Sequence, residues 1–421
     1  MNHRVIQVDE RPPLLEAFPL SLQHLFAMFG ASVLVPILFK INPSTVLLMN
    51  GVGTLIYIWI TKGKVPAFLG SSFAFISPVF VVMASQGYSA ALGGFIAAGV
   101  VFMIVALIIG RAGIGWLDFV FPPASMGAIV AIIGLELAPV AAKMAGLVSD
   151  PTNPALFMAP KALVVSLATL ATVVLGSVVL RGFLAVIPVL LGVIVGYALS
   201  LVLGMVTFDA IQNADWLAMP TFHKPVFSIA AIITIVPAAL VVIAEHVGHL
   251  VVTGNIVGRN FIRDPGLHRS LMGDGISTTL SGLVGSVPTT TYGENIGVLA
   301  ITKVYSVWVI GGAAVLSIVI SFVGKFAAAI ETIPTPVMGG ICLVLFGVIA
   351  ASGIRMLVES HIDYSKPRNL MLTAVTLIVG LSGAHVQIGS VTLAGMALAT
   401  VVAICLSLLL KLFELAGWTN D

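Results

Sequence analysis

The sequence predicts an all-α polytopic membrane protein with 14 transmembrane segments, arranged as two inverted seven-span repeats, with short strands in spans 3 and 10. Three observations support this fold class: the composition, the division into apolar segments and an internal repeat. Of 421 residues, 59% are hydrophobic and 9% are charged, and the mean hydropathy is +1.14. Soluble domains carry about 25% charged residues. A soluble fold of this length could not bury so much apolar surface, so we expect a lipid bilayer as solvent.

Charged residues and clusters of proline and glycine divide the chain into fourteen apolar segments. A helix needs about 20 residues to cross the hydrocarbon, and two segments, 67–85 and 289–303, are short and interrupted. These two require another explanation. The predicted segments are 15–39, 43–60, 67–85, 88–109, 121–141, 161–179, 183–205, 227–253, 269–285, 289–303, 305–324, 334–352, 368–384 and 390–414.

The distribution of basic residues predicts the orientation. An even number of spans places both termini on one side, and that side then holds 14 of the 19 basic residues. The positive-inside rule therefore predicts both termini in the cytoplasm. The polar tail 1–14 lacks the layout of a cleaved signal peptide, so we expect the first span to be retained.

Two stretches share a motif at nearly constant spacing. "GRAGIGWLDFVFPPASMG" (110–127) and "GKFAAAIETIPTPVMGG" (324–340) each run from glycine and a base through an acid and prolines to Met-Gly. Gln23-His24 likewise aligns with Glu245-His246. Several matches in the same order indicate a duplication.

The duplication predicts repeats over 15–205 and 227–414. Each holds seven spans, so the second must insert upside down. Inverted repeats with one broken helix each are typical of secondary transporters, whose site lies at the repeat interface near the membrane midplane.

The two interrupted segments predict strands followed by half-helices. In "SVPTTTYGENIGVLAITK" (286–303), the residues up to Tyr292 favour an extended chain, and Gly293-Glu294-Asn295 can begin a helix. "FLGSSFAF" (68–75), with Gly70 and Ser72, has a similar pattern. Irregular backbone at this depth must be buried or line a cavity. Helix N-termini there would offer donors and partial positive charge to a bound molecule. The alternative is two ordinary kinked helices.

Glu245 and Glu294 are the acidic residues that we expect deep inside spans. Intramembrane carboxylates are costly and therefore suggest function. His249 lies four residues after Glu245, on the same helical face. Burial favours the neutral form of both groups, so the pair can share a proton. The alternative for Glu245 is a structural ion pair.

We expect no metal, no cofactor and no enzymatic activity. "EHVGH" (245–249) has the wrong order and spacing for the zinc motif H-E-x-x-H, and the third ligand is missing. We expect His246 and His24 to hydrogen-bond within the core, and Cys342 and Cys405 to act as small apolar residues. No basic run indicates nucleic acid, and no nucleophile–base pattern indicates a hydrolase.

The segment "ENIGVLAITK" (294–303) resembles the signature of the nucleobase–ascorbate transporter family, Glu294-Asn295-x-Gly297-x-x-x-x-Thr302-Lys303. Gln23-His24 resembles the Gln-His pair of the family. The likeness covers nearly the whole chain. It implies a core domain from spans 1–4 and 8–11, a gate domain from spans 5–7 and 12–14, substrate held between them, and a homodimer.

The resemblance also implies proton-coupled import of uracil across the cell (inner) membrane. Phe73 would stack near the base, Glu245 and Glu294 would hydrogen-bond its polar edge, and Gly293 would allow close approach. His249 would assist proton coupling. The supporting residues would be Gln23, His24, Ser72, Tyr292 and Asn295.

The residue types agree with a pyrimidine-2,4-dione, which offers two N–H donors and two carbonyl acceptors. Family members with glutamine at the first signature position commonly carry purines or ascorbate, so Glu294 favours uracil or xanthine. An anion transporter of the same architecture is the main alternative, although Glu245 and Glu294 would repel an anion. A receptor role remains a further alternative.

Overall fold

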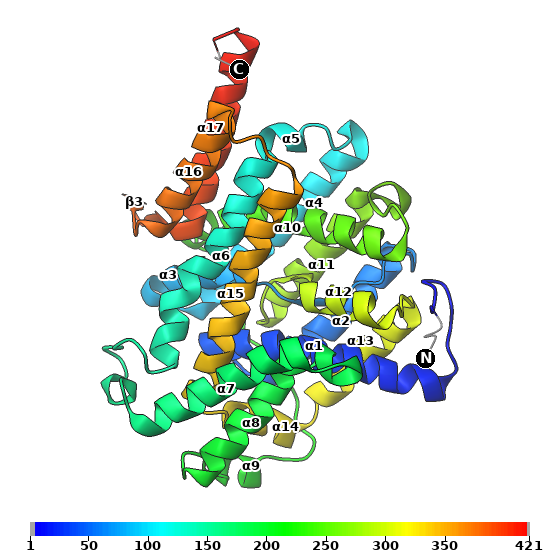
Figure 1. Cartoon of the computed structure of the whole chain (residues 1–421), viewed down its shortest axis with the longest axis vertical. Coiled ribbons are helices and arrows are strands. Elements are labelled where there is room, and N and C mark those ends of the chain that lie inside the picture. The colour runs from blue at the N-terminus through cyan, green and yellow to red at the C-terminus, as the bar shows by residue number, and fades with distance from the viewer. Residues whose placement is uncertain (1–4, 419–421) are drawn as a thin grey trace.

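The computed structural model describes residues 5–418 as a largely helical protein (Figure 1). The first four residues of the predicted tail 1–14 lie outside the described residues. The elements of the first half are α1 (Leu14–Phe39), α2 (Pro43–Ile60), β1 (Leu69–Ser71), η1 (Phe73–Phe75), α3 (Ile76–Gln86), α4 (Tyr88–Ala112), α5 (Leu117–Val120), α6 (Pro123–Met144), η2 (Pro154–Leu156), α7 (Pro160–Val179), η3 (Gly182–Val186), α8 (Pro188–Val202) and α9 (Asp209–Asn213).

The second half again has long helices interrupted by a short strand that a short helix follows, and it adds a hairpin near its end. Its elements are α10 (Ile229–Val257), η4 (Ile262–Gly266), α11 (Leu267–Val284), β2 (Thr289–Thr291), α12 (Gly293–Thr302), α13 (Val307–Ser321), α14 (Gly324–Glu331), α15 (Thr335–Glu359), α16 (Pro367–Leu381), β3 (His385–Ile388), β4 (Val391–Ala394) and α17 (Gly395–Leu415). Each predicted span therefore contains a helix, and spans 3 and 10 contain the predicted strands.

The helix starts follow from local sequence. Pro123, Pro160 and Pro188 each stand at the first position of a helix, where the missing N–H costs nothing. Asn42 caps α2 by accepting a hydrogen bond from the Ser44 amide at 2.8 Å. Within residues 5–418, eight helices are long and apolar enough to cross a membrane. Four further spans contain shorter apolar helices, and α11, with 18 residues, is long enough but more polar.

The repeated motif occupies equivalent places in the two halves. Residues 110–127 contain the end of α4, the short helix α5 and the start of α6, while residues 324–340 contain α14 and the start of α15. In both cases a short helix precedes a long helix that begins next to a proline. The structure thus agrees with the duplication that the sequence predicts.

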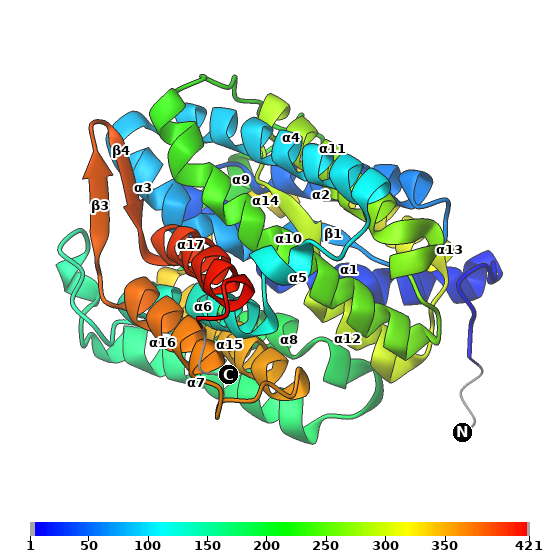
Figure 2. The ribbon, with the colours of Figure 1, turned by 90° about the horizontal axis from the view of Figure 1, so that it is seen from above.

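One predicted boundary is wrong. Span 14 was expected to begin at residue 390, but β3 and β4 form an antiparallel hairpin and α17 begins only at Gly395. His385 opens β3 and pairs with Ala394. The β-branched residues favour strands, and Gly389, with φ +60, supplies the turn. Figure 2 shows the hairpin at one edge of the molecule.

The helices pack as two groups. In the first group, α4 packs against α11 and α10, and α2 packs against α13 and α11. In the second group, α15 packs against α6, α7 and α8, and α16 packs against α6 and α17. Small residues allow this close packing: a Cβ at Gly134 of α6 would lie 2.1 Å from the Phe346 carbonyl oxygen of α15. The two groups meet where α10 contacts α17, β4 and α6, and where α1 contacts α8.

Candidate functional site

Two short strands from opposite halves of the sequence pair at the centre of the first group. β1 and β2 are antiparallel, with Leu69 opposite Thr291 and Ser71 opposite Thr289. The pairing continues on both sides, because the Ser72 amide donates to the Pro288 carbonyl at 2.9 Å and the Tyr292 amide donates to the Phe68 carbonyl at 3.0 Å. The predicted meeting of two strands, each followed by a half-helix, is therefore confirmed.

Close packing across the strands depends on Gly70. A Cβ at this position would lie 2.2 Å from the Tyr292 ring. Tyr292 is buried, and its hydroxyl lies 3.4 Å from Ser32 Oγ, which accepts a hydrogen bond from Asn50 Nδ2 at 3.0 Å. Tyr292 thus connects the strand pair to α1 and α2.

The half-helices begin beside the strand pair with unsatisfied polar groups. η1 and α3 follow β1, and α12 follows β2. The buried side-chain atoms Ser72 Oγ, Thr290 Oγ1 and Asn295 Oδ1 have no hydrogen-bond partner among residues 5–418. Buried polar atoms usually have partners, so these atoms are available to a ligand or to water. The amides in the first turn of each half-helix are also unpaired within the helix.

Glu245 and His249 of α10 lie next to these half-helices. His249 Nδ1 is 3.1 Å from Thr291 Oγ1, which holds the ring against β2. His249 Nε2 would lie 3.5 Å from a Cβ at position 293, so Gly293 leaves room for the ring. α10 contacts β2 and α12, and α12 carries Glu294 in its first turn. Glu245, His249 and Glu294 are only partly buried, in contrast to most of their neighbours. These three groups therefore form an accessible polar cluster inside the protein.

No hydrogen bond joins Glu245 to His249 in the part of the chain that the structure describes. The expected proton-sharing pair is close in sequence, but His249 bonds to Thr291 instead. A proton passing between the two side chains would need a small movement or a bridging molecule.

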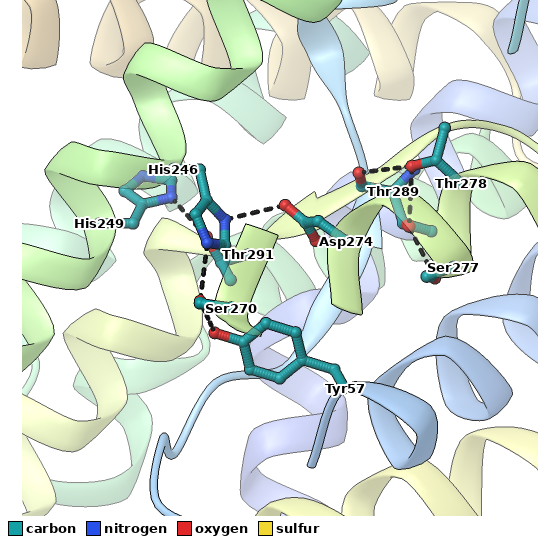
Figure 3. A network of polar contacts seen from close by, with 9 residues as sticks. All are labelled: Tyr57, His246, His249, Ser270, Asp274, Ser277, Thr278, Thr289 and Thr291. Atoms are coloured by element: carbon teal, nitrogen blue, oxygen red, sulfur yellow. Dashed lines mark hydrogen bonds and ion pairs between the residues drawn. The ribbon is translucent and has the colours of Figure 1, made fainter. Parts of the chain in front are cut away.

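His246 belongs to a separate, fully buried network (Figure 3). Its Nδ1 is 2.8 Å from Asp274 Oδ2, and its Nε2 is 2.7 Å from Ser270 Oγ. Ser270 also contacts the Tyr57 hydroxyl at 2.5 Å. The expectation that His246 hydrogen-bonds within the core is confirmed. The network ties α10, α11 and α2 together directly behind Glu245.

Figure 3 also shows how α11 supports β2. The Thr289 amide donates to Thr278 Oγ1 at 3.2 Å, and Thr278 Oγ1 lies 3.1 Å from the Thr289 carbonyl. Thr289 Oγ1 donates to Ser277 Oγ at 2.7 Å. These side chains replace the hydrogen bonds that a wider sheet would supply, so a two-stranded sheet can persist within the membrane.

The expectation that Glu245 and Glu294 are the only acidic residues deep inside spans is wrong. Asp274 lies in the middle of α11 and is fully buried, and Glu136 lies within α6 and is partly buried. Asp274 lies five residues after Arg269 and Glu136 seven residues before Lys143, and an acid so close to a basic residue is ordinary near the end of a span. The structure shows their burial, because it gives the observed ends of α6 and α11 and the partners of the two acids, His246 for Asp274 and the Met396 amide for Glu136.

The remaining predicted residues lie around the same centre. His24 is buried in α1, and its Nδ1 and carbonyl lie 3.2 and 3.1 Å from Asn295 Nδ2. Gln23 is also buried. Phe73 is partly buried, and its ring contacts Phe346 of α15 edge-on at 6.1 Å between centroids. Cys342 and Cys405 are free thiols, as expected.

Comparison with known families decides the class of protein. The model of the permease family (Xan_ur_permease) matches residues 15–389. The chain belongs to this family. It is thus a multi-pass membrane protein of a permease family, and the prediction of a transporter rather than an enzyme agrees with that membership.

Curated relatives cover the chain from end to end. It is 59% identical over 421 residues to the uracil permease of Paenibacillus larvae, covering 100% of both chains. It is 63% identical over 416 residues to the uracil permease of Escherichia coli (strain K12), covering 98% of this chain and 96% of the relative. It is 48% identical over 398 residues to the uracil permease of Bacillus subtilis (strain 168), covering 93% and 91%.

Solved structures of low sequence identity share the fold. The transmembrane domain of the cyanobacterial bicarbonate transporter BicA matches with a TM-score of 0.60 at 14% identity, covering 97% of this chain and 99% of that chain. The murine anion transporter Slc26a9 in its inward-facing state matches with a TM-score of 0.72 at 12% identity, covering 96% and 69%. The predicted fold class of two inverted seven-span repeats is confirmed.

Proposed function

We propose that this permease imports uracil together with protons across the cell membrane by alternating access. The observation that carries the proposal is the cluster of Glu245, His249 and Glu294 beside the N-termini of two half-helices. Relatives that are 48 to 63% identical over nearly the whole chain are named uracil permeases, which supports uracil as the substrate.

The cluster matches the polar pattern of the uracil ring. Glu245 and Glu294 supply acceptors for its two N–H groups, and the unpaired amides at the start of η1 and of α12 supply donors for its two carbonyls. The ring of Phe73 supplies a flat surface for the base. Gly293 and Gly297 are both exposed, and nothing lies within 4 Å of a Cβ at Gly297, so this face of α12 has room for a planar molecule. Such a site discriminates against analogues that leave a buried polar group unpaired.

Glu245 and His249 are the groups that we assign to proton coupling. Glu245 carries the proton in the loaded state because the neutral form tolerates burial next to Glu294. A neutral carboxyl can both donate and accept a hydrogen bond. His249, held by Thr291, takes the proton as substrate leaves towards the cytoplasm. Gln23, His24, Ser72, Tyr292 and Asn295 keep the half-helices and strands in position.

The two packed groups of helices correspond to a core and a gate. We assign α1 to α4 and α10 to α13 to the core, and α6 to α8 with α15 to α17 to the gate. The candidate site then lies on the core face that meets the gate at Phe346. Both termini lie in the cytoplasm in this proposal, the inner membrane is its location, and the functional unit is a homodimer.

The test is uptake of radiolabelled uracil into proteoliposomes, with and without an inward proton gradient. We expect accumulation that depends on the gradient and is inhibited by unlabelled uracil. Unlabelled xanthine and bicarbonate serve as competitors for the alternative substrates. Uptake that ignores the proton gradient would contradict coupling, and competition by bicarbonate but not by uracil would favour an anion transporter.

A further inference from the structure

A further membrane carboxylate, Glu136, lies outside the candidate site and accepts hydrogen bonds from two donors on different elements. Ser77 Oγ of α3 donates to Oε1 at 2.5 Å, and the backbone amide of Met396 in α17 donates to Oε2 at 3.0 Å. Glu136 itself lies in α6 and is partly buried. Each oxygen therefore has one donor, and the carboxylate links three helices.

The start of α17 is shaped around this carboxylate. Gly395 has φ +52, and a Cβ there would lie 1.7 Å from Glu136 Oε1. The residue before it, Ala394, offers no side-chain cap. Glu136 thus caps α17 from a neighbouring helix, where the unpaired amides and the helix dipole favour a negative charge.

The other donor belongs to the half-helix of the candidate site. Ser77 is the second residue of α3 and lies one helical turn after Phe73. Phe73 contacts Phe346 of α15, and α15 packs against α6 at Gly134, two residues before Glu136. The helix pair α6–α15 therefore contacts the same turn of the half-helix twice, through an aromatic ring and through a carboxylate.

We propose that Glu136 is a positioning residue that latches the substrate half-helix to the gate and closes the route to the outside. This inference rests on the proposed function. α3 belongs to the core, whereas α6 and α17 belong to the gate, so their separation breaks the bond from Ser77. With both termini in the cytoplasm, spans 3 and 5 run outward and span 14 starts outside. Ser77, Glu136 and Met396 then lie between the midplane and the outer surface.

The latch stabilises the conformation that is closed to the outside, because the bond forms only there. Hydrogen bonds to charged groups are among the stronger ones in proteins. Removing the Ser77 hydroxyl shifts the balance between outward-open and inward-open forms by about tenfold towards outward-open. Apparent affinity from each side scales with the fraction of the form that is open to that side. The ratio of cytoplasmic KM to external KM for uracil therefore rises by about tenfold in Ser77→Ala.

The experiment compares Ser77→Ala with two controls in right-side-out and inside-out vesicles without a gradient. Ser77→Thr keeps the hydroxyl and restores the parental KM ratio. Ser85→Ala removes another hydroxyl of α3. That hydroxyl bonds to carbonyls of its own helix, at 3.2 Å from Val81 and 3.3 Å from Val82, so its loss leaves the KM ratio unchanged. Loss of a purely structural contact would change both KM values by the same factor, so an unchanged ratio in Ser77→Ala overturns the latch.

Two further measurements keep the test decisive. If Ser77→Ala does not fold, Glu136→Gln replaces it in the same test. Glutamine keeps the shape of the side chain but removes its charge, which weakens the hydrogen bond from Ser77. The ratio of cytoplasmic KM to external KM then shifts in the same direction. Hydrogen exchange of the backbone amides of residues 385–398 can be measured on the purified protein without substrate. It rises in Ser77→Ala relative to Ser85→Ala, because α3 separates more often from the start of α17. Equal exchange in the two variants overturns the latch, whereas absence of uracil uptake by the parent overturns the proposed function alone.

Discussion

At the scale of single residues, the candidate site combines charges that need a partner with polar atoms that lack one. Glu245 lies on α10, which contacts α12, the helix that carries Glu294. Ser72 Oγ, Thr290 Oγ1 and Asn295 Oδ1 are buried without a partner among residues 5–418. Leaving a buried polar group unsatisfied costs about 1–3 kcal/mol, so a ligand that pairs several of them gains affinity and specificity together.

Replacing Glu294 by alanine tests the assignment of this carboxylate. In the proposed site Glu294 accepts an N–H donor of uracil, so Glu294→Ala leaves that donor unpaired and weakens binding by about 1–3 kcal/mol or more, which is roughly tenfold or greater. Titration calorimetry in detergent measures the change. Glu359→Ala, at the exposed end of α15, is the matched control and keeps parental affinity. A folded Glu294→Ala protein with parental affinity would remove Glu294 from the site.

The sequence predicts the burial of some intramembrane acidic residues and not of others, and the reason is physical. Glu245 and Glu294 stand far from any charged punctuation, so their depth follows from the hydropathy pattern alone. Asp274 and Glu136 stand only five and seven residues from a basic residue, and their burial depends on partners from distant helices, His246 and Met396. Partners of that kind are set by tertiary packing and leave no local pattern.

At the scale of elements, the strand pair β1–β2 was predictable and the hairpin β3–β4 was not. The run of threonines before Tyr292 is flanked by a proline and a glycine, which marks an extended segment inside an apolar chain. In "HVQIGSVTLAG" (385–395) the same β-favouring residues continue directly into the apolar run of α17. Apolar periodicity alone does not distinguish a short strand from the start of a helix.

Gly70→Ala tests whether the strand pair depends on close packing. A Cβ at this position would lie 2.2 Å from the Tyr292 ring, and both segments are buried, so neither can move easily. We expect a loss of about 1–3 kcal/mol in stability, together with weaker uracil binding. Gly347→Ala, where nothing lies within 4 Å of the new Cβ, is the control. Thermal unfolding in detergent measures the difference, and equal melting temperatures for the two variants would contradict this role of Gly70.

At the scale of the whole molecule, the inverted repeat explains how one chain builds a polar centre inside lipid. Each half contributes one strand and one half-helix to this centre, and the two strands pair with each other across the repeat interface. Large apolar side chains such as Trp59, Val178 and Val202 remain exposed on the outside, as a lipid-facing surface requires. The number of spans and the duplication follow from sequence periodicity. The division into two packed groups does not, because every span has a similar apolar composition.

The proposed proton coupling belongs to this scale, since the proposal joins the chemistry of one site to the movement of two groups of helices. A symporter must be protonated when substrate binds and must release the proton on the inner side. Glu245 and His249 are the accessible acid and base of the cluster, and His249 is held by Thr291 of β2, so movement of α10 relative to the strands changes its surroundings. Glu245→Gln imitates the neutral carboxyl in shape but cannot release a proton.

We therefore expect Glu245→Gln to keep part of its uracil binding and to lose gradient-driven accumulation. His249→Ala leaves the two carboxylates in place, so it binds uracil but transports it poorly or without a proton. The measurement is uphill uptake of uracil in proteoliposomes under an imposed pH gradient, with binding measured on the same preparations. The control is Glu359→Ala, which changes an acidic residue outside the cluster and accumulates uracil like the parent. If Glu245→Gln and His249→Ala also accumulate uracil like the parent, the proton follows another route, and these two residues only support the structure.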